Sequence, residues 1–239
     1  WEAEAQSLLA ARAALLTQMG EWDAAVEEFQ NGVREYKADL AALHVLATRL
    51  HREGQYAAAM LAVAYLQDLT AAKTPRDLPR LLQMVLYPTP FLPQVQAAAQ
   101  QDAVDPALAY ALMKQESLFN PRAMSGVEAR GLTQVMPATG AEIAAGLGVD
   151  GFTVADLFRP TVSIRFGSYY LAKQLAYLGQ NPVFALAAYN GGAGSALRWM
   201  GNNRQIDPDL FVENIDYEET RAYVLLVMEN YAYYRSLYG

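Results

Sequence analysis

The pattern of hydrophobic and polar positions divides the chain into two parts. Residues 1–70 have the composition of helices with little interruption, built mainly from Ala, Leu, Glu and Gln. Residues 74–93 break this pattern, because prolines recur there and are densest between Tyr87 and Pro93. Beyond them the pattern predicts shorter helices joined by glycine-rich turns, and no stretch sustains the period-two alternation of a strand. An all-α chain with a domain boundary near residue 88 is therefore expected.

An internal repeat lies in the first part. The segment 20–25, Gly-Glu-Trp-Asp-Ala-Ala, recurs as 54–59, Gly-Gln-Tyr-Ala-Ala-Ala, at an offset of 54 − 20 = 34 residues. A glycine, an aromatic residue two positions on and an alanine five positions on, at this period, resemble the tetratricopeptide helix-turn-helix unit. The small residues would let two antiparallel helices pack closely. The alternative is a pair of helical hairpins whose spacing is coincidental.

One helix of the second part has a carboxylate on its apolar face. Asp105-Pro106 is a good helix start and Asn120-Pro121 predicts its end. The apolar stripe between them consists of Leu108, Ala109, Leu112 and Met113. The next position on that stripe is Glu116. A buried carboxyl group raises its pKa to stay neutral, and a protonated acid is what cleavage of a glycosidic bond requires. The alternative is a structural ion pair of Glu116 with Arg130 or Arg165.

Composition narrows the chemistry further. The 239 residues carry 18 Lys and Arg against 25 Asp and Glu, a net charge of −7 with no basic run, which argues against nucleic-acid binding. The absence of cysteine excludes disulfides, thiolate metal sites and a cysteine nucleophile. His44 and His51 are the only histidines and are interpreted as ordinary helix residues. No apolar run is long enough for a membrane span. Because the chain starts at Trp1, a signal peptide, a lipid anchor or further repeats upstream would be invisible in it.

Four ordered blocks in the second part carry a resemblance to a known family. They are Gln115–Pro121, Gly131–Thr139, Ala187–Gly192 and Phe211–Val224. Together they resemble the catalytic domain of the soluble lytic transglycosylases of the bacterial cell envelope. The resemblance implies helical hairpins similar to tetratricopeptide repeats over 1–87, followed by a lysozyme-like helical catalytic domain over 88–239. In that family a much longer ring of helical hairpins precedes the catalytic domain.

The resemblance also implies roles for single residues. Glu116 matches the catalytic acid and base. The positions that match substrate-binding residues are Ser117, Ser125, Gln134, Met136, Tyr189, Asn190 and Glu213. The chain departs from the family at Glu128, where a glycine is usual, and at Thr133, where a methionine is frequent. Both changes are expected to alter the turn of the loop and the lining of the groove. The tyrosines near the end of the chain, including Tyr223, are interpreted as core or surface residues outside the site.

The activity implied by the resemblance is cleavage between N-acetylmuramic acid and N-acetylglucosamine in peptidoglycan, leaving a 1,6-anhydromuramic end. It implies peptidoglycan glycan strands as the partner, no metal or cofactor, and action in the periplasm or cell envelope, with the hairpins as a surface for a protein partner. One alternative is a hydrolase similar to goose-type lysozyme, with Glu128 or Asp150 as a second acid. Another is a non-catalytic glycan-binding or adaptor module, against which the presence of Glu116 argues.

Overall fold

The computed structural model describes residues 11–13, 15–203 and 205–239, and within them the chain is helical. No strand occurs in these ranges; the backbone forms only two isolated bridges, which join Arg130 to Met124 and to Val135. The predicted all-α class is confirmed. In the described ranges no helix is both long and apolar enough to cross a membrane.

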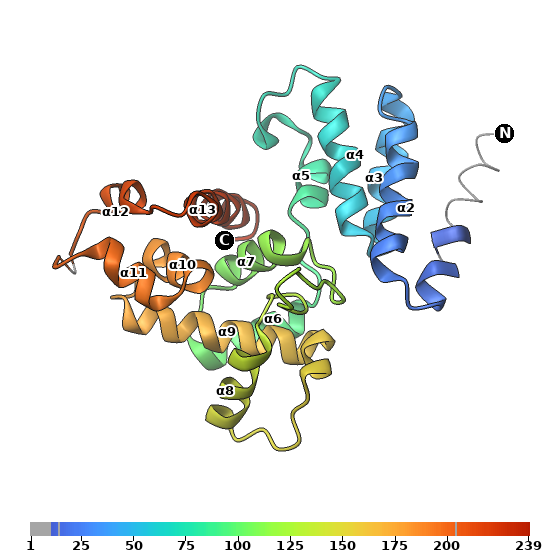
Figure 1. Ribbon diagram of the computed structural model, residues 1–239. Helices are drawn as coiled ribbons and strands as arrows, with labels where there is room; N and C mark the ends of the chain where they lie inside the picture. The colour runs from blue at the N-terminus through green and yellow to red at the C-terminus, as the bar shows by residue number, and fades with distance from the viewer. Residues whose placement is uncertain (1–10, 14, 204) are drawn as a thin grey trace. The chain divides into compact units, whose positions relative to one another are not determined.

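The chain divides into two compact units, residues 1–90 and 91–239, whereas the sequence placed the boundary between residues 87 and 88. The elements of the first unit (Figure 1) are α2 (Trp22–Glu35), α3 (Leu40–Arg52), α4 (Tyr56–Asp68), the 3-10 helix η1 (Pro75–Asp77) and α5 (Arg80–Leu86). Its core lies where α4 packs against α2, α3 and α5. Alanines of α4 at positions 58, 59 and 62 are buried there, and their small side chains let the neighbouring helices approach closely.

The sequence repeat corresponds to one turn that is built twice. Gly20 and Gly54 both have positive φ, 82° and 76°, a conformation that glycine adopts without strain. In each case the next residue donates its backbone N–H to a carbonyl five positions earlier: Glu21 to Leu16 at 2.9 Å, and Gln55 to Leu50 at 2.8 Å. Both turns therefore end one helix and start the next in the same way.

The second unit contains the remaining elements (Figure 1). They are α6 (Leu92–Asp102), α7 (Pro106–Ser117), α8 (Pro137–Leu147), the 3-10 helix η2 (Val154–Phe158), α9 (Pro160–Tyr177), α10 (Pro182–Gly191), α11 (Ala193–Met200), α12 (Pro208–Asn214) and α13 (Glu218–Tyr238). Residues 184–188 of α10 are all buried, as expected of a helix surrounded by protein. This central helix packs against both α9 and α13, while α7 lies along α13.

The helix α7 starts as predicted but ends earlier. The Asp105 side chain caps it by accepting the backbone N–H of Ala107 at 2.9 Å, and the predicted apolar stripe is buried. The helix ends at Ser117 rather than at Asn120. Leu118 and Phe119 have φ values of 48° and 64°, which reverse the chain, and the buried Phe119 ring packs near that of Tyr110. Glu116 is therefore the penultimate residue of α7, at the mouth of the loop 118–136.

Candidate active site

Glu116 is partly buried, and its carboxylate has one hydrogen-bond partner among the described residues. The Tyr223 hydroxyl donates a hydrogen bond to its Oε1 at 2.5 Å. Burial raises the pKa of Glu116 to about 7, and the bond from Tyr223 opposes this rise because it stabilises the charged form. A carboxyl group with this pKa is available near neutral pH both as an acid and as a base.

The ion pair that the sequence offered as an alternative for Glu116 is not formed. Arg165 pairs with Asp102, and the Arg130 guanidinium lies 5.6 Å from the centre of the Phe158 ring. Glu116 makes no ion pair within the part of the chain that the structure describes. Burial without a counter-charge accounts for the raised pKa.

Two tyrosines, the buried Tyr223 and the half-buried Tyr189, accompany Glu116. Tyr223 comes from α13, and Tyr189 from α10 donates its hydroxyl to the carbonyl of Thr133 at 2.8 Å. Burial, followed by the charge of Glu116, raises both phenol pKa values well above 10, so both groups stay neutral donors. The sequence interpretation of Tyr223 missed its bond to Glu116. Its place two positions after Arg221, in the fourth block, was the signal available.

The loop 118–136 is held against α7 by side chains predicted to bind substrate. The Ser117 hydroxyl lies 2.9 Å from the carbonyl oxygen of Leu132. The Gln134 side-chain amide donates to the carbonyls of Ala123 and Gly131, at 3.1 and 2.9 Å. These bonds place Leu132 to Gln134 beside the end of α7, next to Glu116. Ser117 and Gln134 thus shape the loop through their own polar groups.

Two further predicted site residues flank this loop. Ser125 accepts the backbone N–H of Ala129 through its hydroxyl oxygen at 3.0 Å, which tightens the tip of the loop. Met136 is the N-cap of α8 and is exposed. Neither residue forms a hydrogen bond with Glu116.

Thr133 does not line a groove, contrary to the sequence expectation. Its side chain is 2% exposed and its hydroxyl donates to the Ser163 carbonyl of α9 at 2.8 Å. A Cβ atom at Gly167 would stand 2.5 Å from Thr133, so this glycine is what permits the approach. The departure from the family at this position therefore affects the packing of the loop on α9.

Glu128 adopts a left-handed conformation, φ 68°, at an exposed position where the resembling family usually has glycine. Glycine relieves this strain in the folded chain. The gain exceeds the cost of the greater conformational entropy that glycine has in the unfolded chain. We expect Glu128→Gly to raise the free energy of unfolding by roughly 0.5–1 kcal/mol, measured by urea denaturation. Glu142→Gly, in the middle of α8, is the control and should lower it by about 1 kcal/mol. A loss of stability in Glu128→Gly would contradict the strain.

The Asn190 amide is engaged between two helices. Its Oδ1 accepts a hydrogen bond from the Thr220 hydroxyl at 2.6 Å, which ties the end of α10 to the first turn of α13. Thr220 lies one turn before Tyr223 on α13. Asn190 and Tyr189 are thereby brought to the helix that supplies the partner of Glu116.

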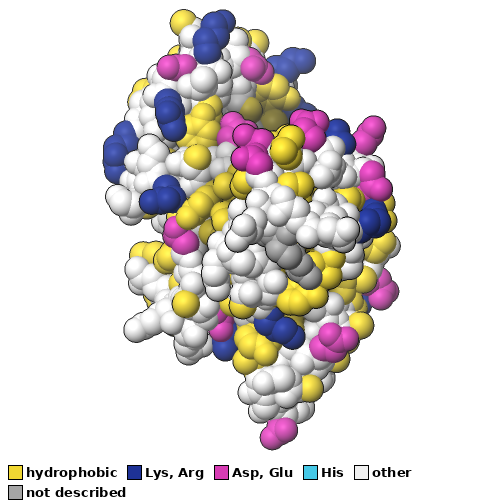
Figure 2. Space-filling view, turned by 90° about the vertical axis from the view of Figure 1, so that its left-hand side faces the viewer, with side chains coloured by type: hydrophobic (Ala, Val, Ile, Leu, Met, Phe, Trp, Pro, Cys, Tyr) yellow, Lys and Arg dark blue, Asp and Glu magenta, His cyan; other side chains and the backbone are white. Residues whose placement is uncertain are grey.

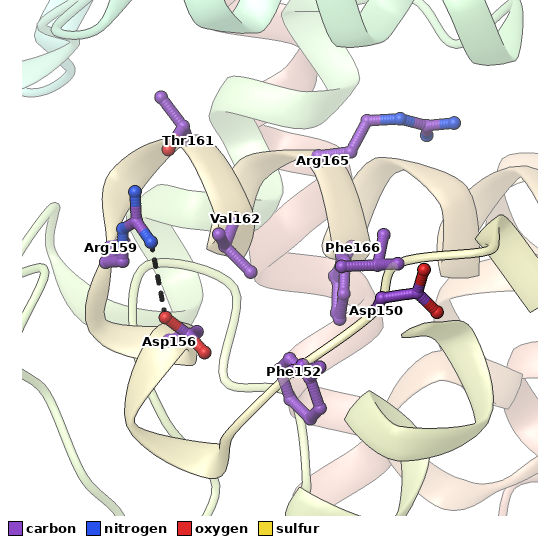
Figure 3. Close-up of a pocket in the computed structure, with 10 residues that line it drawn as sticks. Asp150, Phe152, Asp156, Arg159, Thr161, Val162, Arg165 and Phe166 are labelled. Atoms are coloured by element: carbon purple, nitrogen blue, oxygen red, sulfur yellow. Dashed lines mark hydrogen bonds and ion pairs between the residues drawn. The ribbon is translucent and has the colours of Figure 1, made fainter. Parts of the chain in front are cut away.

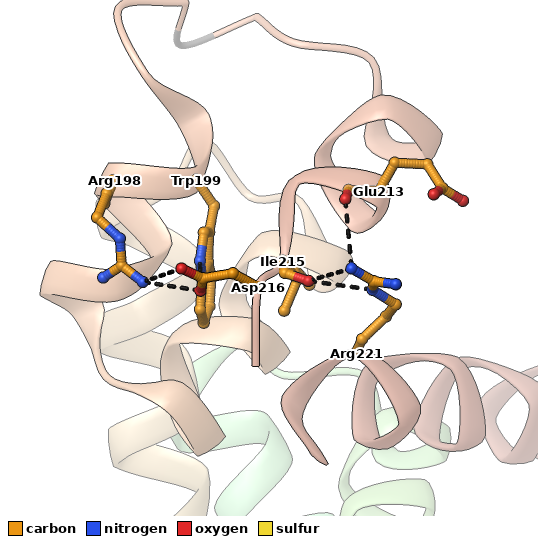
Figure 4. Close-up of polar contacts among 6 residues, drawn as sticks. All are labelled: Arg198, Trp199, Glu213, Ile215, Asp216 and Arg221. Atoms are coloured by element: carbon orange, nitrogen blue, oxygen red, sulfur yellow. Dashed lines mark hydrogen bonds and ion pairs between the residues drawn. The ribbon is translucent and has the colours of Figure 1, made fainter. Parts of the chain in front are cut away.

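Glu213 lies on α12, and its exposed carboxylate points away from Arg221 (Figure 4). Arg221 instead binds backbone carbonyls, that of Ile215 at 2.5 and 3.0 Å and that of Glu213 at 3.5 Å. Asp216 accepts bonds from the Arg198 guanidinium and, at 2.6 Å, from the Trp199 indole. The turn between α12 and α13 is thus fixed from both sides, and no hydrogen bond joins Glu213 to Glu116.

The segment around Glu213 is strongly acidic. Residues 207–219 contain six acids and no base: Asp207, Asp209, Glu213, Asp216, Glu218 and Glu219. Figure 2 faces the side of the second unit on which α11 and α12 lie in Figure 1, and it shows several acidic side chains grouped there. Arg198 pairs with Asp216 of this set, and the other five acids, which form no ion pair with the described residues, repel anions.

A hollow of about 320 Å³ lies between η2, α9 and the turn after α8 (Figure 3). Phe152, Val162 and Phe166 form its apolar part, and Arg159 pairs with Asp156 at its edge. Asp150, one of the second acids considered for a hydrolase, lines this hollow, whereas Glu116 does not.

Comparison with known proteins finds a family that matches most of the second unit. The family model described as "Transglycosylase SLT domain" matches residues 93–212. The soluble lytic murein transglycosylase of Escherichia coli K12 is 39% identical over 133 residues, which are 55% of this chain and 21% of that protein. The chain thus spans about a fifth of the length of this curated relative.

Solved structures show the same similarity. An inactive glutamate-to-glutamine variant of the lytic transglycosylase Slt from Pseudomonas aeruginosa matches with a TM-score of 0.78 and 27% identity, over 94% of this chain and 34% of that one. The 70-kDa soluble lytic transglycosylase of Escherichia coli matches with a TM-score of 0.64 and 24% identity, over 97% of this chain and 46% of that one, a likeness of fold.

Proposed function

Because the chain belongs to the transglycosylase SLT domain family, we propose that it is a lytic transglycosylase that cleaves the glycan strands of peptidoglycan. The observation that carries the proposal is Glu116, an acid without a counter-charge at the end of α7, whose pKa is raised to about 7. An inactive glutamate-to-glutamine variant of the Pseudomonas aeruginosa Slt is in keeping with a single essential glutamate.

In the proposed reaction Glu116 acts first as acid and then as base. Its proton passes to the glycosidic oxygen between N-acetylmuramic acid and N-acetylglucosamine as the bond to C1 breaks. The N-acetyl group of the substrate stabilises the positive charge at C1. The Glu116 carboxylate then takes the proton of the C6 hydroxyl, whose oxygen bonds to C1. A 1,6-anhydromuramic end results, no water is consumed, and no second protein carboxylate is needed, unlike in most glycosidases.

The other residues around Glu116 either orient the acid or bind the glycan. Tyr223 holds Oε1 of Glu116, which leaves Oε2 to face the glycosidic oxygen. The glycan is bound along the loop 118–136 and the ends of α10 and α12. The residues proposed to contact it are Ser117, Ser125, Gln134, Met136, Tyr189, Asn190 and Glu213.

The proposed substrate also implies where the protein acts. Peptidoglycan lies outside the cytoplasm, so we propose action in the periplasm or cell envelope. We propose that residues 88–239 form the catalytic domain and that the helical hairpins of residues 1–87 offer a surface to a protein partner. The reaction as written uses neither metal nor cofactor.

Mass spectrometry of digested peptidoglycan tests the proposed function. Purified sacculi are incubated with the protein and, in parallel, with Glu116→Gln. Muropeptides one water lighter than hydrolysed ones, absent from the Glu116→Gln digest, are the expected result. Reducing-end products would make the protein a hydrolase. If the unsubstituted protein gave no products, the alternative of a non-catalytic glycan-binding module would be favoured.

The proposed domain division predicts that the fragment 88–239 retains cleavage. All the contacts described around Glu116, from α7 to α13, lie within this fragment. We expect its kcat on soluble glycan strands to lie within about tenfold of the full chain, measured by release of anhydro ends. Circular dichroism verifies that the fragment is folded. A folded but inactive fragment would mean that the hairpins contribute to the site.

A further inference from the structure

Two arginines of the loop 118–136 converge on one aromatic ring. The guanidinium carbons of Arg122 and Arg130 lie 5.8 and 5.6 Å from the centre of the Phe158 ring, at the end of η2. Stacking on a ring orients a guanidinium without neutralising its charge. Two positive charges that share a ring repel one another, so an anion placed between them would be strongly favoured.

Arg130 has no anionic partner among the described residues. Its Nε is shielded from solvent and lacks a hydrogen-bond partner. The side chain as a whole is half-buried, and its guanidinium forms no ion pair with the described residues. The nearest acid in sequence, Glu128, is exposed and makes no ion pair. Asp156 of η2 pairs with Arg159 instead, at 3.3 Å. The open fork of Arg130 is therefore left for a ligand.

The backbone fixes Arg130 next to the proposed glycan site. Its N–H donates to the Val135 carbonyl at 3.1 Å, and its carbonyl accepts the Val135 N–H at 3.2 Å. These bonds place Arg130 beside Gly131 to Gln134, the stretch that Ser117 ties to α7. The backbone of Arg130 is thus fixed, and stacking on Phe158 orients its guanidinium before any ligand arrives. Both lower the entropic cost of binding.

We propose that Arg122 and Arg130 bind carboxylate groups of the peptide stems that peptidoglycan carries on its muramic acid units. This inference rests on the proposed function, since the stems enter with the glycan. The planar arginine fork matches a carboxylate in two parallel hydrogen bonds, which sugar hydroxyls cannot provide. The acidic segment 207–219 repels the same carboxylates, so an anionic stem is directed to the arginine pair.

The test compares two substrates that differ only in the stems. Peptidoglycan strands are used intact and after an amidase has removed the peptides. We expect Arg130→Gln to lower kcat/KM on intact strands about tenfold, through KM, and to leave cleavage of stem-free strands unchanged. Arg122→Gln should also lower kcat/KM on intact strands. Arg130→Lys keeps the charge but loses the planar fork, so its kcat/KM should lie between those of the unsubstituted protein and Arg130→Gln. An equal loss on both substrates, or no loss on either, overturns the proposal.

Arg235→Gln is the matched control. This arginine also stacks on an aromatic ring, at 5.8 Å from the centre of Tyr231 on α13, but it lies outside the loop. Its substitution should leave kcat/KM unchanged on both intact and stem-free strands. Cleavage of stem-free strands by Arg130→Gln serves as the measure of folding, because a misfolded loop would lower this activity as well.

A direct titration keeps this proposal separate from the proposed function. Calorimetry with a free stem tetrapeptide, and with the same peptide amidated at its carboxylates, does not require cleavage. Binding of the free peptide by the full chain, lost on amidation and in Arg130→Gln, supports the arginine pair even if neither strand is cleaved. If the full chain does not bind the free peptide, the proposed role of Arg122 and Arg130 is overturned, whatever the result of the cleavage assay.

Discussion

We expect Glu116→Gln to lower kcat on purified peptidoglycan by a factor of roughly 10²–10⁴, the range that a positioned acid or base contributes. The amide cannot give a proton to the glycosidic oxygen and cannot take one from the C6 hydroxyl. Its oxygen still accepts the bond from Tyr223, so the surroundings of α7 are kept. The measurement is the rate of anhydro-end formation by mass spectrometry, with activity near that of the unsubstituted protein as the contrary outcome.

The same substitution should change the pH dependence of stability. The folded protein holds the Glu116 proton with a pKa of about 7, against 4.5 for the group in its ordinary state. A raised carboxyl pKa favours the folded state below 4.5, and this contribution is lost as pH rises toward 7. Glutamine does not titrate. Relative to the unsubstituted protein, Glu116→Gln should therefore gain on the order of 3 kcal/mol between pH 4 and pH 8. Parallel pH profiles of the two proteins would contradict the raised pKa.

Two carboxylates serve as controls for the loss of activity. Glu128 is exposed on the loop and Asp150 lines the hollow beside η2. Glu128→Gln and Asp150→Asn should each leave cleavage within about twofold, because the proposed reaction uses neither group. A large loss in either variant, together with reducing-end products, would favour the hydrolase.

The sequence located Glu116 because the signals were local. The cap at Asp105, the proline after it and the apolar stripe all lie within one helix, and periodicity alone put the carboxylate on the buried face. The end of that helix was missed because Leu118 and Phe119 adopt left-handed conformations. Such conformations are uncommon for residues with a side chain, and here they follow from the burial of Phe119 against Tyr110.

The partners of the site depend on tertiary packing and could not be derived from local pattern. Tyr223 is 107 residues from Glu116 in sequence, and only the packing of α13 along α7 brings the two together. The Thr133 side chain turns toward α9 because Gly167 leaves room for it there. The family resemblance identified the blocks in which these residues lie, but not the direction of each side chain.

We expect Tyr223→Phe to lower kcat by about ten- to a hundredfold and to move the alkaline limb of the pH profile. Oε1 of Glu116 loses the one bond that orients the carboxyl group, and misplacement of a reacting group by about 1 Å is enough for such a loss. The phenyl ring fills the same buried space, so the fold should be kept.

The direction of the pH shift separates this role from a purely structural one. Cleavage needs the protonated acid, so kcat/KM of the unsubstituted protein should fall as pH rises through about 7. The Tyr223 bond lowers the pKa of Glu116. Its removal should therefore move this limb to higher pH, by up to about one unit. Tyr231→Phe is the control, since Tyr231 makes a similar bond to the exposed Asp105 at 2.6 Å. It should leave the limb in place, and an unmoved limb in Tyr223→Phe would mean that this tyrosine does not tune the acid.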